Sequence, residues 1–409
     1  VSLIATLVSL YARYSVSVDI PESKQAQFYA AYQLCLLGFL GMSLTGDIFN
    51  VFVFLEISSL ATYALIAMGR RRQAIIAAFQ YLVLGTIGAT FFLIGIGLAY
   101  SATGTLNMAD LAMRLNDNVH VRTVQTAFGF IFIGMALKAA MFPLHLWLPR
   151  AYIYAPVMIS AFLAGTATKV AIYVIARTTF SVFTISYVIT TAFNELMILF
   201  GAIAVLYGAI QAIRQTSVKP LLAWSSLSQI GYFMIGIGLL SATGLMATMV
   251  HLFNHALIKT CLFLAAGIML YQTGTLKLSQ LGGIGRQMPL TFAAMVIAGL
   301  SLIGVPGTVG FISKWYLVLA AVEQQAWGIT IVILLGSLVA IVYVWKLLEV
   351  MYFQPDDQAE IVIEDRKERI LPLIVPVWIL AVSCIYLGID TSITVGAAEN
   401  AVLSLGLKP

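Results

Sequence analysis

The chain has 409 residues, of which 61% are hydrophobic and 10% are charged, and its formal net charge is +5. Soluble domains carry about 25% charged residues, so this composition excludes a string of soluble domains and predicts one all-α, polytopic transmembrane domain over residues 1–409. Lys and Arg form no patch with interleaved aromatic residues, which excludes nucleic acid as a partner. The lipid bilayer is the expected surrounding.

Apolar runs of a length that crosses a bilayer, about 20 residues, recur along the whole sequence. They predict about twelve transmembrane helices, with boundaries uncertain by several residues. In chain order the predicted spans are 1–18, 28–47, 48–69, 74–101, 124–149, 157–177, 186–213, 219–240, 244–271, 290–322, 327–352 and 370–392.

The distribution of basic residues gives these spans an orientation. Cytoplasmic loops of membrane proteins are rich in Lys and Arg, which places the Arg70–Arg72 turn in the cytoplasm. When the spans alternate from there, most of the other basic residues also fall on that side. Few fall on the outer side: Arg114, Arg122, Arg177 and Lys408. Both ends of the chain are then expected outside.

Ionisable residues within the spans are the most informative feature of the sequence. A charged side chain at the bilayer centre costs at least ~2.5–3.5 kcal/mol, and such residues usually mark ion or proton pathways. The predicted site, with a role in proton translocation, consists of Glu56, Lys138, Lys169, His251, His255, Lys259 and Lys314.

His251, His255 and Lys259 follow one another at intervals of four residues, which places them on one face of a helix. A stripe of titratable groups suits a proton relay, because His changes charge near neutral pH. Metal binding is the rival interpretation. Two His without a third ligand make a weak site, so no metal and no cofactor are expected. The cysteines are isolated in apolar runs, at Cys35, Cys261 and Cys384.

A purely structural role for the buried charges must be weighed against transport. A single Lys–Glu pair can simply hold two helices in register, and for Glu56 with Lys138 alone the two interpretations are about even. Four Lys and one Glu do not neutralise each other, however. Some of the Lys must be neutral or reached by water, and either condition favours transport.

Two predicted spans contain helix breakers. The fifth contains Pro143 and Pro149, and the tenth contains Pro306 among several Gly. Since five spans separate the breaks, the second set is inverted relative to the first, which is typical of transporters. This predicts one inverted repeat over residues 28–177, a second over 186–352, and a separate C-terminal helix over 370–392.

Several motifs resemble the antiporter-like subunits of respiratory complex I, and in particular the D subunit of Mrp-type multisubunit Na+/H+ antiporters. The resemblance covers essentially the whole chain. The motifs are Gly46–Glu56, Lys138 followed by Phe142–Pro149, Ala155-Pro156 with Ser160-Ala161, Lys219–Gln229, Asn254–Ala256 with Lys259, and Pro306-Gly307 leading to Lys314.

The resemblance implies a fold and residue roles. Family members have fourteen spans built on two inverted five-helix repeats, so this chain, which begins with Val1, is expected to lack the first two. Glu56 is expected to pair with Lys138, and Lys169 to link that pair to a central axis. His251, His255, Lys259 and Lys314 would continue the axis. One departure is Tyr152, where relatives often carry His; a Tyr titrates near ~10 and is a poor relay at neutral pH.

The expected function is therefore that of a proton-translocating subunit in a multisubunit Na+/H+ antiporter. The chain would be a transporter rather than an enzyme in itself, would work with other subunits, and would lie in a bacterial or archaeal plasma membrane. The first alternative is a proton-pumping membrane-arm subunit of a complex I-like quinone oxidoreductase or a membrane-bound hydrogenase. The second is a structural subunit that conducts no ions.

Overall fold

The computed structural model describes residues 1–116, 122–183, 185–189, 191–354 and 367–407. Their regular structure is helical apart from two isolated backbone bridges, which confirms the all-α prediction. Arg366, Lys408 and most of the polar loop expected at 354–369 lie outside these ranges. The first helices are α1 Ser2–Asp19, α2 Glu22–Leu44, α3 Ile48–Ala67, α4 Arg72–Thr103, α5 Met108–Asn116, α6 Arg122–Ala139, α7 Trp147–Tyr154, α8 Val157–Gly165, α9 Ala167–Arg177 and α10 Ile185–Ile189. They are followed by α11 Phe193–Ile213, α12 Val218–Gly238, α13 Ala242–Thr273, α14 Ile284–Gln287, α15 Pro289–Ile303, α16 Val309–Glu323, α17 Trp327–Leu348, α18 Lys367–Ile389 and α19 Ser392–Ser404.

Eight helices in the described part of the chain are long and apolar enough to cross a membrane. The other four predicted spans correspond to α1, to α2, to the pair α6 and α7, and to the pair α15 and α16. As single helices these fall below the length or the hydropathy of a complete span, and for the two pairs the reason is a break in the middle. The chain is thus a multi-pass membrane protein with interrupted helices.

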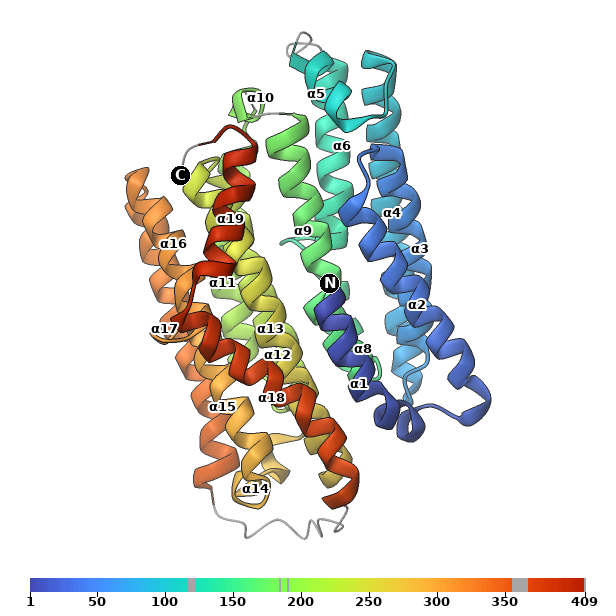
Figure 1. Ribbon diagram of the computed structural model, residues 1–409, viewed down its shortest axis with the longest axis vertical. Helices are drawn as coiled ribbons and strands as arrows, with labels where there is room; N and C mark the ends of the chain where they lie inside the picture. Colours follow the sequence, from blue (N-terminus) through green and yellow to red (C-terminus); the bar gives the residue numbers. More distant parts are fainter. Residues whose placement is uncertain (117–121, 184, 190, 355–366, 408–409) are drawn as a thin grey trace.

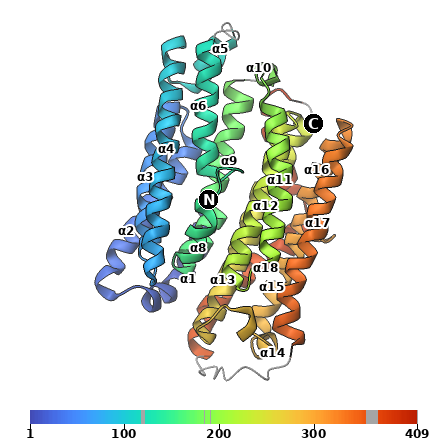
Figure 2. The same ribbon diagram turned by 180° about the vertical axis from the view of Figure 1, so that it is seen from behind.

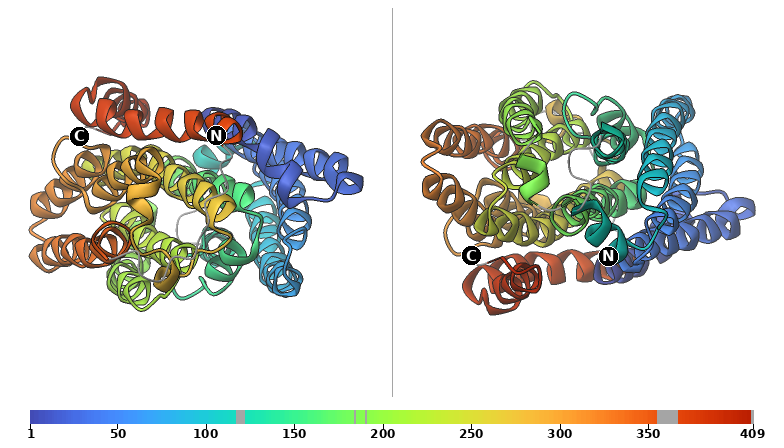
Figure 3. Two further views of the ribbon diagram at one scale, coloured as in Figure 1. Left: turned by 90° about the horizontal axis from the view of Figure 1, so that it is seen from below. Right: turned by 90° about the horizontal axis from the view of Figure 1, so that it is seen from above.

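The helices form two groups with a shared centre (Figure 1). Helices α2, α3, α4 and α6 stand on one side and α11, α12, α15, α16 and α17 on the other, as the view from behind also shows (Figure 2). Helix α13 packs against α8 and α9 as well as α12, α15 and α16, so it joins the two groups. Helices α1 and α18 contact each other and lie along one long face of the bundle (Figure 3).

The same corner is built twice, once in each group. Both α4 and α13 end at a Thr-Gly-Thr-Leu sequence in which the Gly has a positive φ, 73° at Gly104 and 68° at Gly274. The residue after each Leu forms an isolated backbone bridge to the turn between two earlier helices, Asn107 with Asp47 and Lys277 with Ser217.

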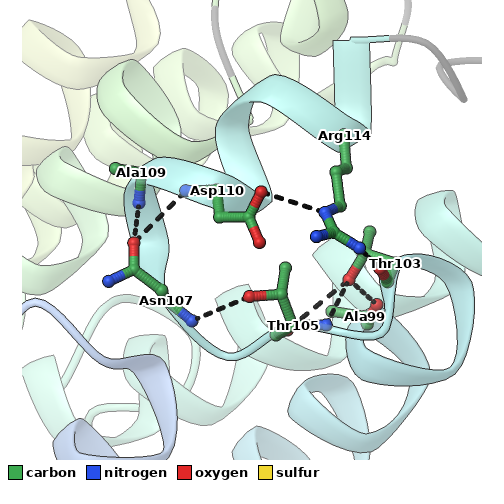
Figure 4. Close-up of polar contacts among 7 residues, drawn as sticks. All are labelled: Ala99, Thr103, Thr105, Asn107, Ala109, Asp110 and Arg114. Carbon is green, nitrogen blue, oxygen red and sulfur yellow. Dashed lines mark hydrogen bonds and ion pairs between the residues drawn. The ribbon is translucent and has the colours of Figure 1, made fainter.

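Figure 4 shows the first of these corners. The Thr105 hydroxyl accepts a hydrogen bond from the backbone N–H of Asn107, and the Thr275 hydroxyl accepts one from the backbone N–H of Lys277 at the matching position. The first corner adjoins α5 and the second leads to α14, and these two helices lie at opposite ends of the molecule (Figure 1).

In each group, a basic side chain donates to the backbone carbonyls at the C-terminal end of the helix that precedes the corner. Arg177, at the end of α9, donates to the carbonyl of Thr45 at 2.6 Å. Lys346, near the end of α17, donates to the carbonyl of Gln215 at 2.9 Å and to that of Ile213 at 2.7 Å. Cations stabilise the free carbonyl groups at helix C-termini, so these two contacts fix α2 and α11 in equivalent ways.

The structure adds four details to the predicted spans. The span expected at 157–177 is confirmed within the membrane-crossing segment Val157–Val182, in which Thr166, with a φ of −127°, separates α8 from α9. The span expected from 186 begins as a helix only at Phe193, because α10 is separate. The short helix α5 and the C-terminal helix α19, which follows the last predicted span, were not expected. Their sequences are short or mixed in polarity, so they resemble loops.

Candidate functional site

Lys138 lies one residue before the end of α6, where the first helix break begins. Its side chain is buried, and its ammonium nitrogen donates to the hydroxyl of Ser59 on α3 at 2.6 Å. The same nitrogen lies 5.3 Å from the centre of the Tyr81 ring. Residues three apart on a helix share a face, so Ser59 and the half-buried Glu56 line the same side of α3.

The expected ion pair between Glu56 and Lys138 is not formed directly. The described part of the chain contains two ion pairs, Arg70 with Asp19 and Arg114 with Asp110, and neither includes these residues. The Ser59 hydroxyl takes the direct contact with Lys138 instead. It could not be identified from the sequence, because hydroxyls are common in apolar helices.

Lys169 lies just after the break between α8 and α9. A helix break leaves backbone carbonyls without their usual partners, and the Lys169 ammonium donates to one of them, the carbonyl of Ala164. A second, longer contact of 3.4 Å reaches the Thr168 hydroxyl. Gly165, beside the break, packs so closely on Thr260 that an added Cβ would collide with its hydroxyl. Lys169 is thereby held next to α13.

The stripe on α13 is completely inside the protein. Helix α13 runs without a break from Ala242 to Thr273, so the three residues of the stripe lie on one continuous helix. His251, His255 and Lys259 are all buried. The two imidazole rings are stacked with centroids 5.6 Å apart and 9° between their planes. The Lys259 ammonium donates to the carbonyl of Leu222 at 3.0 Å and to the Ser225 hydroxyl at 2.6 Å.

Lys314 lies on α16, just after the second helix break. Its ammonium donates to two carbonyls at the end of α15, Leu302 at 3.1 Å and Ile303 at 2.7 Å. The preceding residue, Ser313, bonds Nδ1 of His251 through its hydroxyl at 2.9 Å. The stripe on α13 and the second break are therefore in direct contact.

Several buried polar atoms near the stripe have no hydrogen-bond partner among the described protein groups. They are Nε2 of His251, both ring nitrogens of His255, and Oδ1 of Asn254. No group of three His, Cys, Asp or Glu side chains in this part of the chain could hold a metal ion. Among the described residues, no third side chain joins His251 and His255 to form a metal site.

Three further residues belong beside the predicted ones. His145, in the first break, is buried with both ring nitrogens unpartnered. Lys219 was expected at a span edge, yet it is buried and donates to the carbonyl of Ala155 at 2.7 Å. Tyr152, the departure from the family pattern, is fully buried and donates to the carbonyl of Leu163 at 3.1 Å.

Residues 45–340 match the protein family described as NADH:quinone oxidoreductase/Mrp antiporter, transmembrane. The chain belongs to this family. Among curated members it is 42% identical over 381 residues to the N subunit of the NADH-quinone oxidoreductase of Desulforudis audaxviator, covering 90% of this chain and 74% of the relative. It is 31% identical over 388 residues to the D subunit of the Na(+)/H(+) antiporter of Alkalihalophilus pseudofirmus, covering 95% and 77%.

Solved structures from the family share the fold. A chain of the Mrp complex from a Dietzia species superposes with a TM-score of 0.87 at 26% identity, covering 99% of this chain and 82% of that one. A chain of the membrane-bound sulfane sulfur reductase, an archaeal respiratory complex, superposes with a TM-score of 0.88 at 32% identity, covering 99% of this chain and 81% of that one. A chain of respiratory complex I from Thermus thermophilus superposes with a TM-score of 0.76 at 27% identity, covering 97% of this chain and 85% of that one. All three neighbours are subunits of multisubunit membrane complexes.

Proposed function

We propose that this chain translocates protons through the membrane as one subunit of a larger complex. The proton path runs along the buried row of ionisable side chains and enters or leaves it near the helix breaks. We define the row by the residues Glu56, Lys138, Lys169, His251, His255, Lys259 and Lys314.

The partners of the four Lys carry this proposal. Each ammonium nitrogen donates only to neutral acceptors, either Ser or Thr hydroxyls or backbone carbonyls. None of the ion pairs in the described ranges involves a residue of the row. Burying several unpaired positive charges together is very costly, whereas an amine can avoid this cost by giving up its proton. A row of such amines can load and release protons in turn.

The hydroxyls and unpartnered nitrogens supply the steps between amines. Ser313 lies next to Lys314 in the chain and bonds His251, whose ring stacks on that of His255. Buried polar atoms are nearly always hydrogen-bonded, often to water, so the free nitrogens of the two His favour a hydrated path.

We further propose the family's repeat organisation for this chain. It comprises twelve spans, one inverted repeat over residues 28–177, a second over 186–352 and a C-terminal helix over 370–392, each repeat containing one broken helix. The two corners at Asp47 and Ser217, at opposite ends of the molecule, support this division.

Two kinds of complex are candidates for the partner subunits. Exchange of H+ for Na+ is supported by the likeness to the D subunit of the antiporter, which extends over 95% of the chain. Redox-driven pumping is supported by the higher identity, 42%, to the N subunit of the quinone oxidoreductase. In either case the expected location is the plasma membrane of a bacterium or archaeon.

The test uses the whole complex in liposomes with a pH-sensitive dye inside. An antiporter moves protons when a Na+ gradient is imposed, whereas a redox-driven pump responds only to an electron donor. We expect proton movement in one of these assays, its loss in Lys259→Met, and its retention in Lys24→Met, which changes an exposed Lys. Equal movement in wild type and Lys259→Met would remove the row from the mechanism. No movement under either condition would favour the structural role.

A further inference from the structure

A cavity of about 730 Å³ lies where the two helix groups meet, at the end of the molecule that carries Arg70. Its walls come from the end of α1, the junction of α7 and α8, the start of α12 and the end of α13. The charged residues that line it are Asp19, Arg70, Arg71, Lys219 and Lys277. None of the residues of the row faces it.

Asp19 lines this cavity and takes part in a network of polar contacts. Its side chain is only 10% exposed and forms an ion pair with Arg70 at 3.4 Å. Its second oxygen accepts a hydrogen bond from the Tyr271 hydroxyl at 2.6 Å, and Tyr271 also contacts the Ser15 hydroxyl at 2.5 Å. These contacts join the ends of α1 and α13 and give the cavity a polar wall.

Lys219 also lines the cavity and lies on the helix that holds Lys259 of the row. Its side chain is buried, and its single described hydrogen bond, to the carbonyl of Ala155, leaves its charge without an anionic contact. Lys219 lies one helical turn before Leu222 on α12, a rise of about 4.5 Å. The carbonyl of Leu222 is one of the two acceptors that hold Lys259. The cavity therefore ends one turn from the middle of the row.

The equivalent corner at the opposite end of the molecule carries no basic residue at the matching position. In the matched corners, Lys219 follows Ser217 by two residues and Phe49 follows Asp47 by two residues. Lys219 is 8% exposed, whereas Phe49 is 40% exposed and apolar. A basic residue has thus been placed at only one of two equivalent positions, the one that lines the cavity.

We propose that this cavity is a water-filled site at which protons enter the row, with Lys219 as the first group to hold them. This rests on the proposed function. Lys219 passes its proton to neutral Lys259 through the Ser225 hydroxyl and water near Leu222, a transfer that leaves the total charge of the two amines unchanged. Lys259 then gives the proton to the next group of the row, and a hydronium ion in the cavity reprotonates Lys219 and leaves a water molecule behind. The competing role for Lys219 is a structural tie between α12 and the α7–α8 junction.

Substitutions of Lys219 separate the two roles. Arg keeps the positive charge and the bond to the Ala155 carbonyl but does not release its proton. We expect Lys219→Met and Lys219→Arg both to lower proton movement by the intact complex at least tenfold, with Lys24→Met unchanged. Wild-type activity in Lys219→Arg would mean that the residue is only a structural tie and would overturn the proposal.

Access of water to the cavity is tested without measuring transport. Ile153 lines the cavity and is partly exposed, whereas Val205 is buried elsewhere, and the three native cysteines are buried. In the intact complex, a charged methanethiosulfonate reagent should label Ile153→Cys from the Arg70 side only, and should not label Val205→Cys or the unsubstituted protein. Absence of labelling at Ile153→Cys, with normal proton movement, would overturn the entry site and leave the proposed function standing. Labelling without any proton movement in the wild type would overturn both.

Discussion

The Lys138 ammonium donates to the Ser59 hydroxyl at 2.6 Å, and this contact brings it to the face of α3 that carries Glu56. The hydroxyl can accept from Lys138 and donate elsewhere at the same time. It donates here to the carbonyl of Leu55 on its own helix. Because Ser59 follows Glu56 by three residues on the same helix, its hydroxyl is placed to couple the acid and the amine although they form no direct ion pair.

Replacing Glu56 by Gln tests whether the acid takes part. Gln keeps the shape and polarity of the side chain but cannot carry the negative charge that favours a proton on Lys138. We expect Glu56→Gln to abolish ion-driven proton movement while the protein still inserts into the membrane. The measurement uses everted vesicles and a pH-sensitive dye, at equal amounts of protein. Wild-type exchange in the variant would exclude Glu56 from the mechanism.

Lys169→Arg tests whether this position must release a proton. Arg remains charged at any accessible pH, so it can replace a fixed positive charge but not a relay. We expect proton movement to fall at least about tenfold, which corresponds to about 1.4 kcal/mol. Lys24→Arg, on the surface, is the matched control. If Lys169→Arg keeps full turnover, the position needs only its charge.

Close packing of α2 on α3 predicts a stability effect at Gly38. A Cβ at this position would lie 2.6 Å from Cβ of Ser58 and 2.7 Å from the backbone oxygen of Phe54. Such overpacking costs about 1–3 kcal/mol, so Gly38→Ala should lower the midpoint of thermal unfolding of the detergent-solubilised complex. Gly97→Ala, where nothing lies within 4 Å, should leave the midpoint unchanged or raise it. A normal midpoint for Gly38→Ala would mean that the two helices separate easily.

The corner at Asp110 should loosen in acid. Hydrogen bonds from Arg114 and then Thr105 hold the pKa of Asp110 below its ordinary value of 3.8. Because the folded pKa is the lower one, its contribution to stability is complete above the unfolded pKa and is lost as the pH falls through the folded value. We expect faster amide hydrogen exchange in α5 as the pH is lowered to about 3, after correction for the intrinsic pH dependence of exchange.

The second corner provides an internal control for this measurement. Gln280 stands where the first corner has Asp110, and it accepts a hydrogen bond from the Thr275 hydroxyl at 2.7 Å. An amide does not titrate, so exchange after α13 should show no corresponding change. Asp110→Asn should also remove the acid dependence from the first corner. An equal response at both corners would point to general loosening of the protein in acid.

The sequence identified the buried ionisable residues because charge in an apolar run is conspicuous. It also predicted the shared face of His251 and His255, since spacing alone determines which residues of an unbroken helix are neighbours. The partners of these residues, such as Ser59, Ser225 and Ser313, come from other helices. Their pairing depends on tertiary packing, and nothing in the spacing of residues along one helix indicates it.

Other features were missed because their signals are weak. The break at Thr166 contains no Pro, so nothing distinguished it from a continuous span. Lys219 adjoins a polar turn, and a basic residue at a span edge normally reaches the membrane surface. The two Thr-Gly-Thr-Leu corners are a residue-level repeat, but four residues shared between distant segments become meaningful only when both are seen to form the same turn.

Helix α13 is unbroken over 32 residues, a length of about 48 Å, whereas the helices that hold Lys138, Lys169 and Lys314 are each interrupted beside the Lys. A continuous helix keeps its hydrogen bonds and bends little, while a break concentrates backbone rotation at a few residues. The middle of the row is therefore rigid, and the helices on either side of it can change conformation at their breaks. During transport the stacked imidazole rings should keep a fixed geometry, while the ammonium groups of the other three Lys move relative to them. The conformational changes at the breaks should then set the rate of proton transfer.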